Sequence, residues 1–206
     1  NALTLIEGDR FSYLAAVFGY MFLVLGIMTL AGRAGSLLVV VALVFNLHFF
    51  RVNVESWKHN KDVSENLLRS FSWSNAPQIY LLALPDNFAG SYMFRSFPTD
   101  DYFGRRLDLQ YNLQVECKTI HVLQYNMQQV QDGVRVELVS DSDLKVCFNQ
   151  WGNWWWYGSI GASNYQTENY EVTLLDGCYL LHLKRKQPGA VYLYQTGGTW
   201  HQVSGF

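Results

Sequence analysis

The sequence has two long stretches that lack charged side chains. No Asp, Glu, Lys or Arg occurs in the 22 residues 11–32 or in the 17 residues 34–50. As α-helices these stretches would be roughly 33 Å and roughly 25 Å long, and the hydrocarbon core of a bilayer is about 30 Å thick. A helical hairpin buried in a soluble protein usually keeps a polar stripe on each helix. We therefore predict two transmembrane spans, at about 11–32 and 34–50, rather than a buried hairpin.

The features of a cleavable signal peptide are also missing, namely a basic start, a shorter apolar region and a cleavage site of small residues. Here acidic residues precede the first apolar stretch, and the second stretch follows after AGRAGS, a sequence typical of a helix–helix turn. Residues 1–53 are thus predicted to form a transmembrane hairpin with both ends on one side of the membrane. Because the sequence begins with Asn1 rather than Met, we expect it to be part of a longer membrane protein.

Cysteine is scarce, with three residues at positions 117, 147 and 178. No CxxC pair or Cys/His cluster occurs, so a zinc site is not expected. One disulfide would indicate an oxidising compartment. Between one disulfide and three buried free thiols, we favour the free thiols.

Common catalytic motifs are absent from the sequence. It contains no GxSxG, HExxH, GxxxxGK[ST] or GxGxxG, so we predict no catalytic residue, metal or cofactor. The net charge is −2 and the only basic run is Lys184–Lys186, which argues against a nucleic-acid partner. The histidines have no evident carboxylate or cysteine partner in the sequence and are interpreted as structural: His48, His59, His121, His182 and His201.

The region after the apolar stretches is mixed in character. Residues 54–73 have apolar side chains at helical spacing and predict an amphipathic helix, while 79–84 form a compact apolar run typical of a buried strand. We expect 54–110 to be a stalk of helix, strand and loop. In 111–206, alternating apolar residues separated by Gly-containing turns predict an antiparallel β module, such as a small sandwich or curled barrel. The expected fold is a membrane α-helical hairpin followed by a soluble α+β, mostly antiparallel β module.

A tryptophan-rich segment, NQWGNWWWYGS, lies within the predicted β module. Aromatic rings stack on sugars and on cations, so the tryptophans of this segment are candidates for contacting a carbohydrate. Rings on both faces of a strand are equally typical of core packing or of a bilayer surface, and we favour that interpretation. The candidates are Trp151, Trp154, Trp155 and Trp156.

Three charged residues, Glu7, Asp9 and Arg10, stand directly before the first apolar stretch. Ionisable residues at a membrane edge are costly and often functional. Arg10 offers a forked, permanently charged donor for a lipid phosphate, and an acidic neighbour could hold that fork in place. An arginine that anchors the helix at the headgroups, beside an acidic helix cap, explains the same residues equally well.

Two parts of the sequence resemble a known superfamily. EGDRFSYLAAVF resembles the acidic-x-acidic-Arg-aromatic-x-Tyr-Leu stretch before a late transmembrane helix of GT-C glycosyltransferases, the group of the protein O-mannosyltransferases and related bacterial membrane enzymes. Many relatives continue with Tyr-Leu-Pro-Ser, where this chain has Tyr-Leu-Ala-Ala. ESWKHNKDVSENLL followed by IYLLALPDNFAGSYMFR is similar to the tail of large bacterial membrane proteins of this type. The resemblance covers about residues 5–95.

The resemblance implies the C-terminal part of an integral-membrane enzyme that uses a polyprenyl-phosphate-linked sugar. Arg10, with Glu7 and Asp9, would face the lipid phosphate, and the catalytic aspartate would lie in an external loop outside this chain, so the chain alone is expected to be inactive. The resemblance also places the C-terminal module in the periplasm of a bacterial inner membrane. The charge count, with more Lys and Arg beside the outer ends of the predicted hairpin than in its turn, favours the cytoplasm instead, and we follow the resemblance.

Two alternatives remain open. The chain could be a non-enzymatic subunit whose helices anchor a β module in a larger membrane complex, or a carbohydrate-binding module on a membrane stalk. The expected partners are membrane lipid, the lipid-linked sugar, and other subunits or the preceding part of the same protein. Exposure of Trp154 or Trp156 on the surface would favour the carbohydrate-binding module.

Overall fold

The computed structural model of the chain divides into two compact units, Asn1–Trp57 (unit 1) and Lys58–Phe206 (unit 2). The structure describes residues 2–73, 75–85, 87–88, 91–94, 102–112, 120–126, 133–148 and 164–206.

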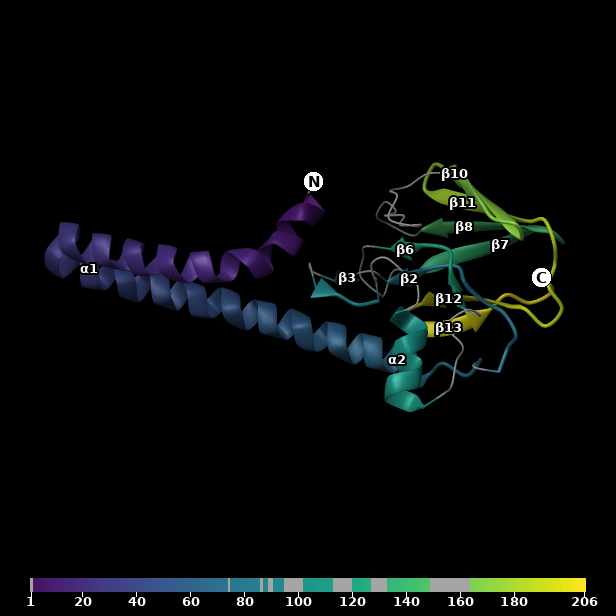
Figure 1. The fold of residues 1–206 in the computed structure, drawn as a ribbon, viewed down its shortest axis with the longest axis horizontal. Coiled ribbons are helices and arrows are strands. Elements are labelled where there is room, and N and C mark those ends of the chain that lie inside the picture. Colours follow the sequence, from purple (N-terminus) through teal and green to yellow (C-terminus); the bar gives the residue numbers. More distant parts are fainter. Residues whose placement is uncertain are drawn as a thin grey trace. The chain divides into compact units, whose positions relative to one another are not determined.

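A single long helix, α1 (Ala2–Arg69), contains both apolar stretches. The helix bends sharply within unit 1. The bend is evident from a close approach of the chain to itself, since a Cβ placed on Gly35 would lie only 2.6 Å from the carbonyl oxygen of Ile27. In a straight helix, residues eight positions apart are about 12 Å apart. Figure 1 accordingly shows α1 as two helical limbs that meet at a turn. Glycine is required at position 35, since any larger side chain would collide with the backbone of the first limb.

In the part of α1 that belongs to unit 1, most of the described apolar side chains are exposed. Phe22 is 75% and Leu37 is 68% exposed, and most other apolar side chains described between residues 18 and 52 are exposed too, whereas Val24, Ile27 and Val39 are half-buried. Within the described residues, one helical segment, Ala34–Arg69, is long and apolar enough to cross a membrane, with none of its most apolar window buried, and Phe18–Thr29 is a shorter apolar segment. Residues 11–32 and 34–50 are helical, as expected, but among the described residues only the second stretch lies in a segment that meets the length and composition of a membrane span, and insertion of the hairpin into a membrane stays a prediction.

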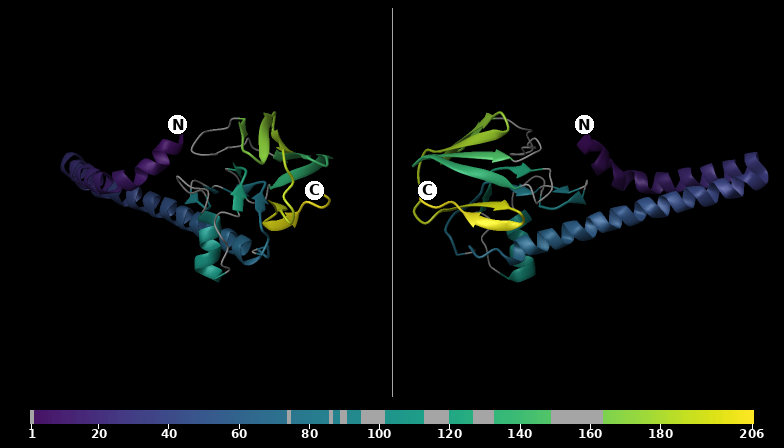
Figure 2. Two further views of the ribbon diagram at one scale, coloured as in Figure 1. Left: turned by 45° about the vertical axis from the view of Figure 1, so that its right-hand side comes forward. Right: turned by 180° about the vertical axis from the view of Figure 1, so that it is seen from behind.

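Unit 2 contains two main sheets in separate layers. The mixed sheet has the order β13-β12-β1-β5, and the antiparallel sheet has the order β7-β8-β11-β10-β9. In Figure 2 the green strands of the antiparallel sheet and the yellow strands β12 and β13 form distinct layers. The strands of the mixed sheet are β1 (Ile79–Leu81), β5 (Ile120–Val122), β12 (Val191–Thr196) and β13 (Thr199–Gln202). Those of the antiparallel sheet are β7 (Val134–Ser140), β8 (Asp143–Phe148), β9 (Tyr165–Gln166), β10 (Tyr170–Leu175) and β11 (Cys178–Leu183).

Four short strands and one helix complete the described fold. Two small strand pairs follow the ends of β1 and β5, and one helix precedes β5. They are β2 (Leu84–Pro85) with β6 (Tyr125–Asn126), β3 (Asn87–Phe88) with β4 (Ser91–Tyr92), and α2 (Tyr102–Tyr111).

The domain division differs from the one expected from the sequence. Strand β1 lies between β5 and β12 and is parallel to both, so the segment expected to be a stalk supplies the central strand of the mixed sheet. All three residues of β1 are buried, as is typical of a strand covered on both faces. The antiparallel pairing expected after residue 111 holds for the five-stranded sheet, whereas β5 and β12 join β1 in parallel.

Helices cover one face of the mixed sheet. Leu67 and Leu68 of α1 belong to the same buried cluster as Phe103 and Leu107 of α2 and Ile79 and Leu81 of β1. The indole Nε1 of Trp200 in β13 donates a hydrogen bond of 2.8 Å to the carbonyl oxygen of Leu67, near the end of α1. The amphipathic helix predicted over 54–73 is thus confirmed as the last part of α1, which ends at Arg69.

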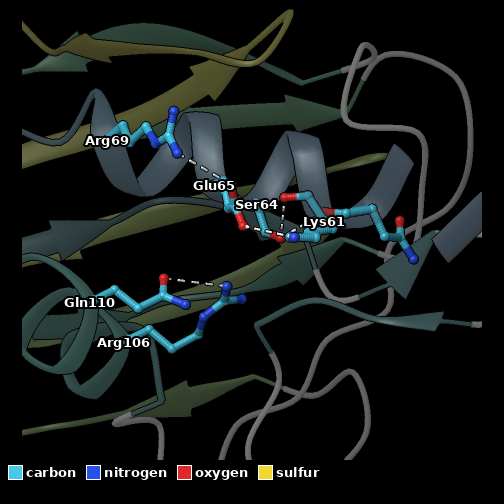
Figure 3. A network of polar contacts seen from close by, with 7 residues as sticks. Lys61, Ser64, Glu65, Arg69, Arg106 and Gln110 are labelled. Atoms are coloured by element: carbon cyan, nitrogen blue, oxygen red, sulfur yellow. Dashed lines mark hydrogen bonds and ion pairs between the residues drawn. The ribbon is translucent and has the colours of Figure 1, made fainter. Parts of the chain in front are cut away.

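Polar side chains pair on the exposed side of these helices. Glu65 of α1 lies between Lys61, at 3.7 Å, and Arg69, at 3.5 Å, and Arg106 of α2 lies 3.5 Å from Gln110 (Figure 3). These pairs are spaced by four residues on a helix surface, where each contributes only a few tenths of a kcal/mol, about 0.2–0.5. These contacts are ordinary surface pairs within each helix, and we do not interpret them as a functional site.

Candidate functional site

The predicted phosphate-binding residues all lie in α1. Glu7, Asp9 and Arg10 fall within the helix rather than before its start, and only their backbone is described. Glu7 and Arg10 are three positions apart, the spacing that brings two residues to one side of a helix. The predicted sugar-stacking residues Trp151 and Trp154–Trp156 lie outside the described residues.

A cluster of polar side chains surrounds Asp143, at the start of β8. Its Oδ1 lies 2.8 Å from Nδ1 of His182 in β11, directly opposite in the sheet. The hydroxyls of Ser140 and Ser142, in the turn from β7 to β8, donate to Oδ2. The structural interpretation of His182 holds, but the histidine does have a carboxylate partner, which the sequence did not indicate because 39 residues separate the pair.

An aspartate that holds a histidine through Nδ1 is the arrangement of a general base in hydrolases. In such enzymes a serine hydroxyl contacts the other ring nitrogen, whereas here both serines donate to the carboxylate itself. The cluster therefore fixes the β7–β8 turn against β11. The Ser140 hydroxyl and the His182 ring, which stabilise the charged carboxylate, lower the pKa of Asp143.

Replacing Asp143 with Asn is expected to lower the free energy of unfolding at pH 7 by less than about 1 kcal/mol, because the pair is partly exposed to solvent. A carboxyl group whose pKa is depressed by folding stabilises the fold above the pKa of the unfolded chain, and this contribution is lost as the pH falls. Urea unfolding at pH 7 and pH 3 should therefore show a difference between the Asp143→Asn variant and wild type that shrinks at pH 3. Asp141→Asn in the same turn is the control, and an equal loss in that variant would contradict the role of Asp143.

A stacked aromatic row lies on the other face of the mixed sheet. The ring of Tyr80 in β1 stacks on His121 of β5 and on Tyr192 of β12, with ring centroids 4.9 Å apart in both cases. Nε2 of His121 donates to Oε1 of Gln78 at 2.6 Å. Burial lowers the pKa of His121 and raises the pKa of Tyr80 and of Tyr192, so all three rings are kept neutral. This row is packing between the sheets, in agreement with a structural role for His121.

Two tyrosines of the antiparallel sheet bind the backbone where β1 and β5 end. The hydroxyl of Tyr179 donates to the carbonyl oxygen of Leu82 at 2.8 Å, and that of Tyr165 donates to Leu123 at 2.9 Å. These carbonyls lie where regular strand pairing stops, so the hydroxyls satisfy buried acceptors that the sheet leaves open. The contacts join the two sheets.

Cys147 and Cys178 form a disulfide across the antiparallel sheet. The two residues are directly opposite in β8 and β11, with their Cα atoms 4.0 Å apart. The expectation of three free thiols was therefore wrong for this pair. Sequence spacing alone does not show which strands become neighbours, and only their pairing brings these cysteines together. Cys117 lies outside the described residues.

Among the described residues, no group of three or more His, Cys, Asp or Glu side chains is arranged to hold a metal ion. The chain matches no protein-family model, and comparison with curated proteins and with solved structures found no significant match.

Proposed function

We propose that the chain is anchored in a membrane by α1 and carries unit 2 on the outer, oxidising side, which in a bacterium is the periplasm. The anchoring is supported by the uncharged, exposed side chains of α1, since soluble monomers rarely expose apolar surface on this scale. The side of the membrane is supported by the Cys147–Cys178 disulfide, because disulfides persist in oxidising compartments and are rare in the cytosol.

Within this arrangement, we propose that the chain is part of a glycosyltransferase that uses a polyprenyl-phosphate-linked sugar. The proposal is supported by the resemblance of residues 5–95 to GT-C enzymes. Arg10 is assigned to the lipid phosphate, with Glu7 and Asp9 holding its guanidinium. Their position in α1, directly before the apolar stretch, suits a group that meets a phosphate at the membrane surface.

The assignment is tested by lipid binding, which does not need the catalytic base. The 206-residue chain is reconstituted in phosphatidylcholine vesicles and titrated with a fluorescent polyprenyl phosphate. Loss of a charge-assisted hydrogen bond, worth about 1.5–3 kcal/mol, predicts that Arg10→Ala weakens binding by about tenfold or more. Arg33→Ala, in the turn between the apolar stretches, is the matched control and should bind normally, and unphosphorylated polyprenol should bind weakly to every variant.

Equal binding of polyprenyl phosphate by the wild type and by Arg10→Ala would exclude the phosphate role. If neither binds while the chain resists extraction from the vesicles with alkaline carbonate, the non-enzymatic anchored subunit becomes the better description. Release of the chain by carbonate would contradict membrane anchoring itself.

A further inference from the structure

Asn46 interrupts the apolar stretch 34–50 of α1, and Asn53 follows shortly after that stretch ends. Asn46 lies between Phe45 and Leu47, whose side chains are 63% and 66% exposed, and it is itself exposed. Its Nδ2 donates a hydrogen bond of 2.8 Å to the carbonyl oxygen of Ala42, one turn earlier. Among the described residues, the side-chain oxygen of Asn46 has no donor. Asn53 is exposed two turns further along the helix.

The helical period brings these residues onto one face. Positions 39, 42, 46 and 53 are spaced by three, four and seven residues, the pattern of a helix–helix seam. Gly35 is on the same face and is buried against Ile27, so near the turn this face already packs against the first limb of α1. Beyond Val39 the seam is open: Ala42, Asn46 and Asn53 are exposed.

Exposing a carboxamide to lipid costs more free energy than exposing it to water. Hydrocarbon offers no hydrogen bonds, so a carboxamide that faces lipid keeps an unsatisfied acceptor. Transmembrane helices relieve this cost by associating with a helix that supplies a matching group, and small residues such as Ala42 let the two backbones approach closely. If α1 spans a bilayer, as proposed above, the open seam requires such a partner.

We propose that this seam, formed by Ala42, Asn46 and Asn53, binds the same seam of a second copy of the chain. A carboxamide carries both donor and acceptor, so it is complementary to itself. In a parallel pair related by a twofold axis, each asparagine lies opposite its own counterpart, and the Asn46 side chains hydrogen-bond across the axis. A single asparagine in a core seam position is known to fix the register and the pairing of two helices in this way.

The opposite face of α1 offers a matched control. His48 is two residues from Asn46, at the same depth and also exposed, but it lies roughly 160° away around the helix, and its ring packs at 6.0 Å from Phe49. A seam that acts through polarity alone would depend on both residues. A seam with a defined face depends on Asn46 and not on His48.

The test is sedimentation equilibrium of the full chain in density-matched detergent micelles. Wild type should show a monomer–dimer equilibrium that shifts with the protein-to-detergent ratio. Hydrogen bonds between transmembrane helices contribute about 0.6–1.7 kcal/mol, so Asn46→Leu should raise the dissociation constant about 3- to 18-fold, while His48→Leu leaves it unchanged. In a Cys117→Ser background, Asn53→Cys should cross-link two chains on mild oxidation in vesicles, and Val52→Cys should not.

Several outcomes would overturn the seam. They are a chain that stays monomeric at every ratio, an equal effect of His48→Leu, or equal cross-linking from positions 52 and 53. An Asn46→Leu variant that loses stability without any change in association would assign Asn46 to contacts with the first limb of its own chain. Extraction of the chain from vesicles by carbonate would remove both this seam and the proposed anchoring, whereas a monomer that resists extraction would remove the seam alone.

Discussion

Removal of the Cys147–Cys178 disulfide is expected to lower the free energy of unfolding by about 3–4 kcal/mol. The bond closes a loop of 31 residues, and in the chain-entropy account a loop of this length restricts the unfolded chain by about that amount. The two cysteines are paired directly across β8 and β11, the central strands of the antiparallel sheet, so the native sheet holds them opposite each other without a change of register. The loss should therefore arise chiefly in the unfolded state.

The measurement is urea unfolding of the detergent-solubilised full chain, followed by tryptophan fluorescence. A Cys147→Ser/Cys178→Ser double variant is compared with wild type, and Cys117→Ser serves as the control for replacing a thiol outside the bond. The wild type in reducing buffer should unfold at nearly the same urea concentration as the double variant. Equal midpoints for wild type and double variant would mean that the bond contributes nothing to stability.

The same bond gives a test of compartment that is independent of stability. If unit 2 lies on the oxidising side, Cys147 and Cys178 are already bonded to each other in the cell. A thiol-specific reagent added to intact cells before lysis should then label only one cysteine per chain. Three reactive cysteines in chain taken directly from cells would place unit 2 in a reducing compartment. That result would contradict the proposed orientation even if α1 spans the membrane.

Local signals in the sequence predicted the hairpins well. The β10–β11 hairpin turns at Asp176-Gly177 and the β12–β13 hairpin turns at Gly197-Gly198, where both glycines have positive φ, 57° and 74°. Such turns join neighbouring strands and can be recognised in the sequence from about two residues. Parallel strand pairing has no such local sequence signature. The partners of β1 begin about 40 and 110 residues later, so nothing near Ile79 indicates that this strand is the centre of a sheet.

The polar contacts were hidden from the sequence for a related reason. Asp143 and His182, or Tyr179 and Leu82, meet only because strands distant in sequence become neighbours. Gln124 and Gln195 are completely buried, although glutamine is usually a surface residue, and no pattern around them indicates it. The charged residues before the first apolar stretch can be identified from composition alone, and their position at a membrane edge stays a prediction.

Replacement of Tyr179 with Phe is expected to lower the free energy of unfolding by about 1–3 kcal/mol. Its hydroxyl is completely buried and donates to the carbonyl oxygen of Leu82, just after β1 ends. The ring of phenylalanine fills nearly the same volume, so packing between the sheets persists, but the Leu82 carbonyl loses its donor in a place that water does not reach. Removing one partner of a buried hydrogen bond costs more than the bond contributes on average.

Tyr165→Phe is the matched control, because it removes the equivalent hydrogen bond to Leu123 at a partly buried position. Water can replace that hydroxyl, so the loss should be clearly smaller than in Tyr179→Phe.

The pH dependence adds a second readout. Burial raises the pKa of Tyr179 well above its usual value, so the folded chain keeps the phenol neutral while the unfolded chain ionises it. The stability that Tyr179 contributes is therefore complete below about pH 10 and declines as the pH rises further, and the gap between wild type and Tyr179→Phe should narrow in urea unfolding above that pH. Equal losses in the two variants at pH 7 would show that the Leu82 carbonyl is solvated and that this contact does not join the sheets.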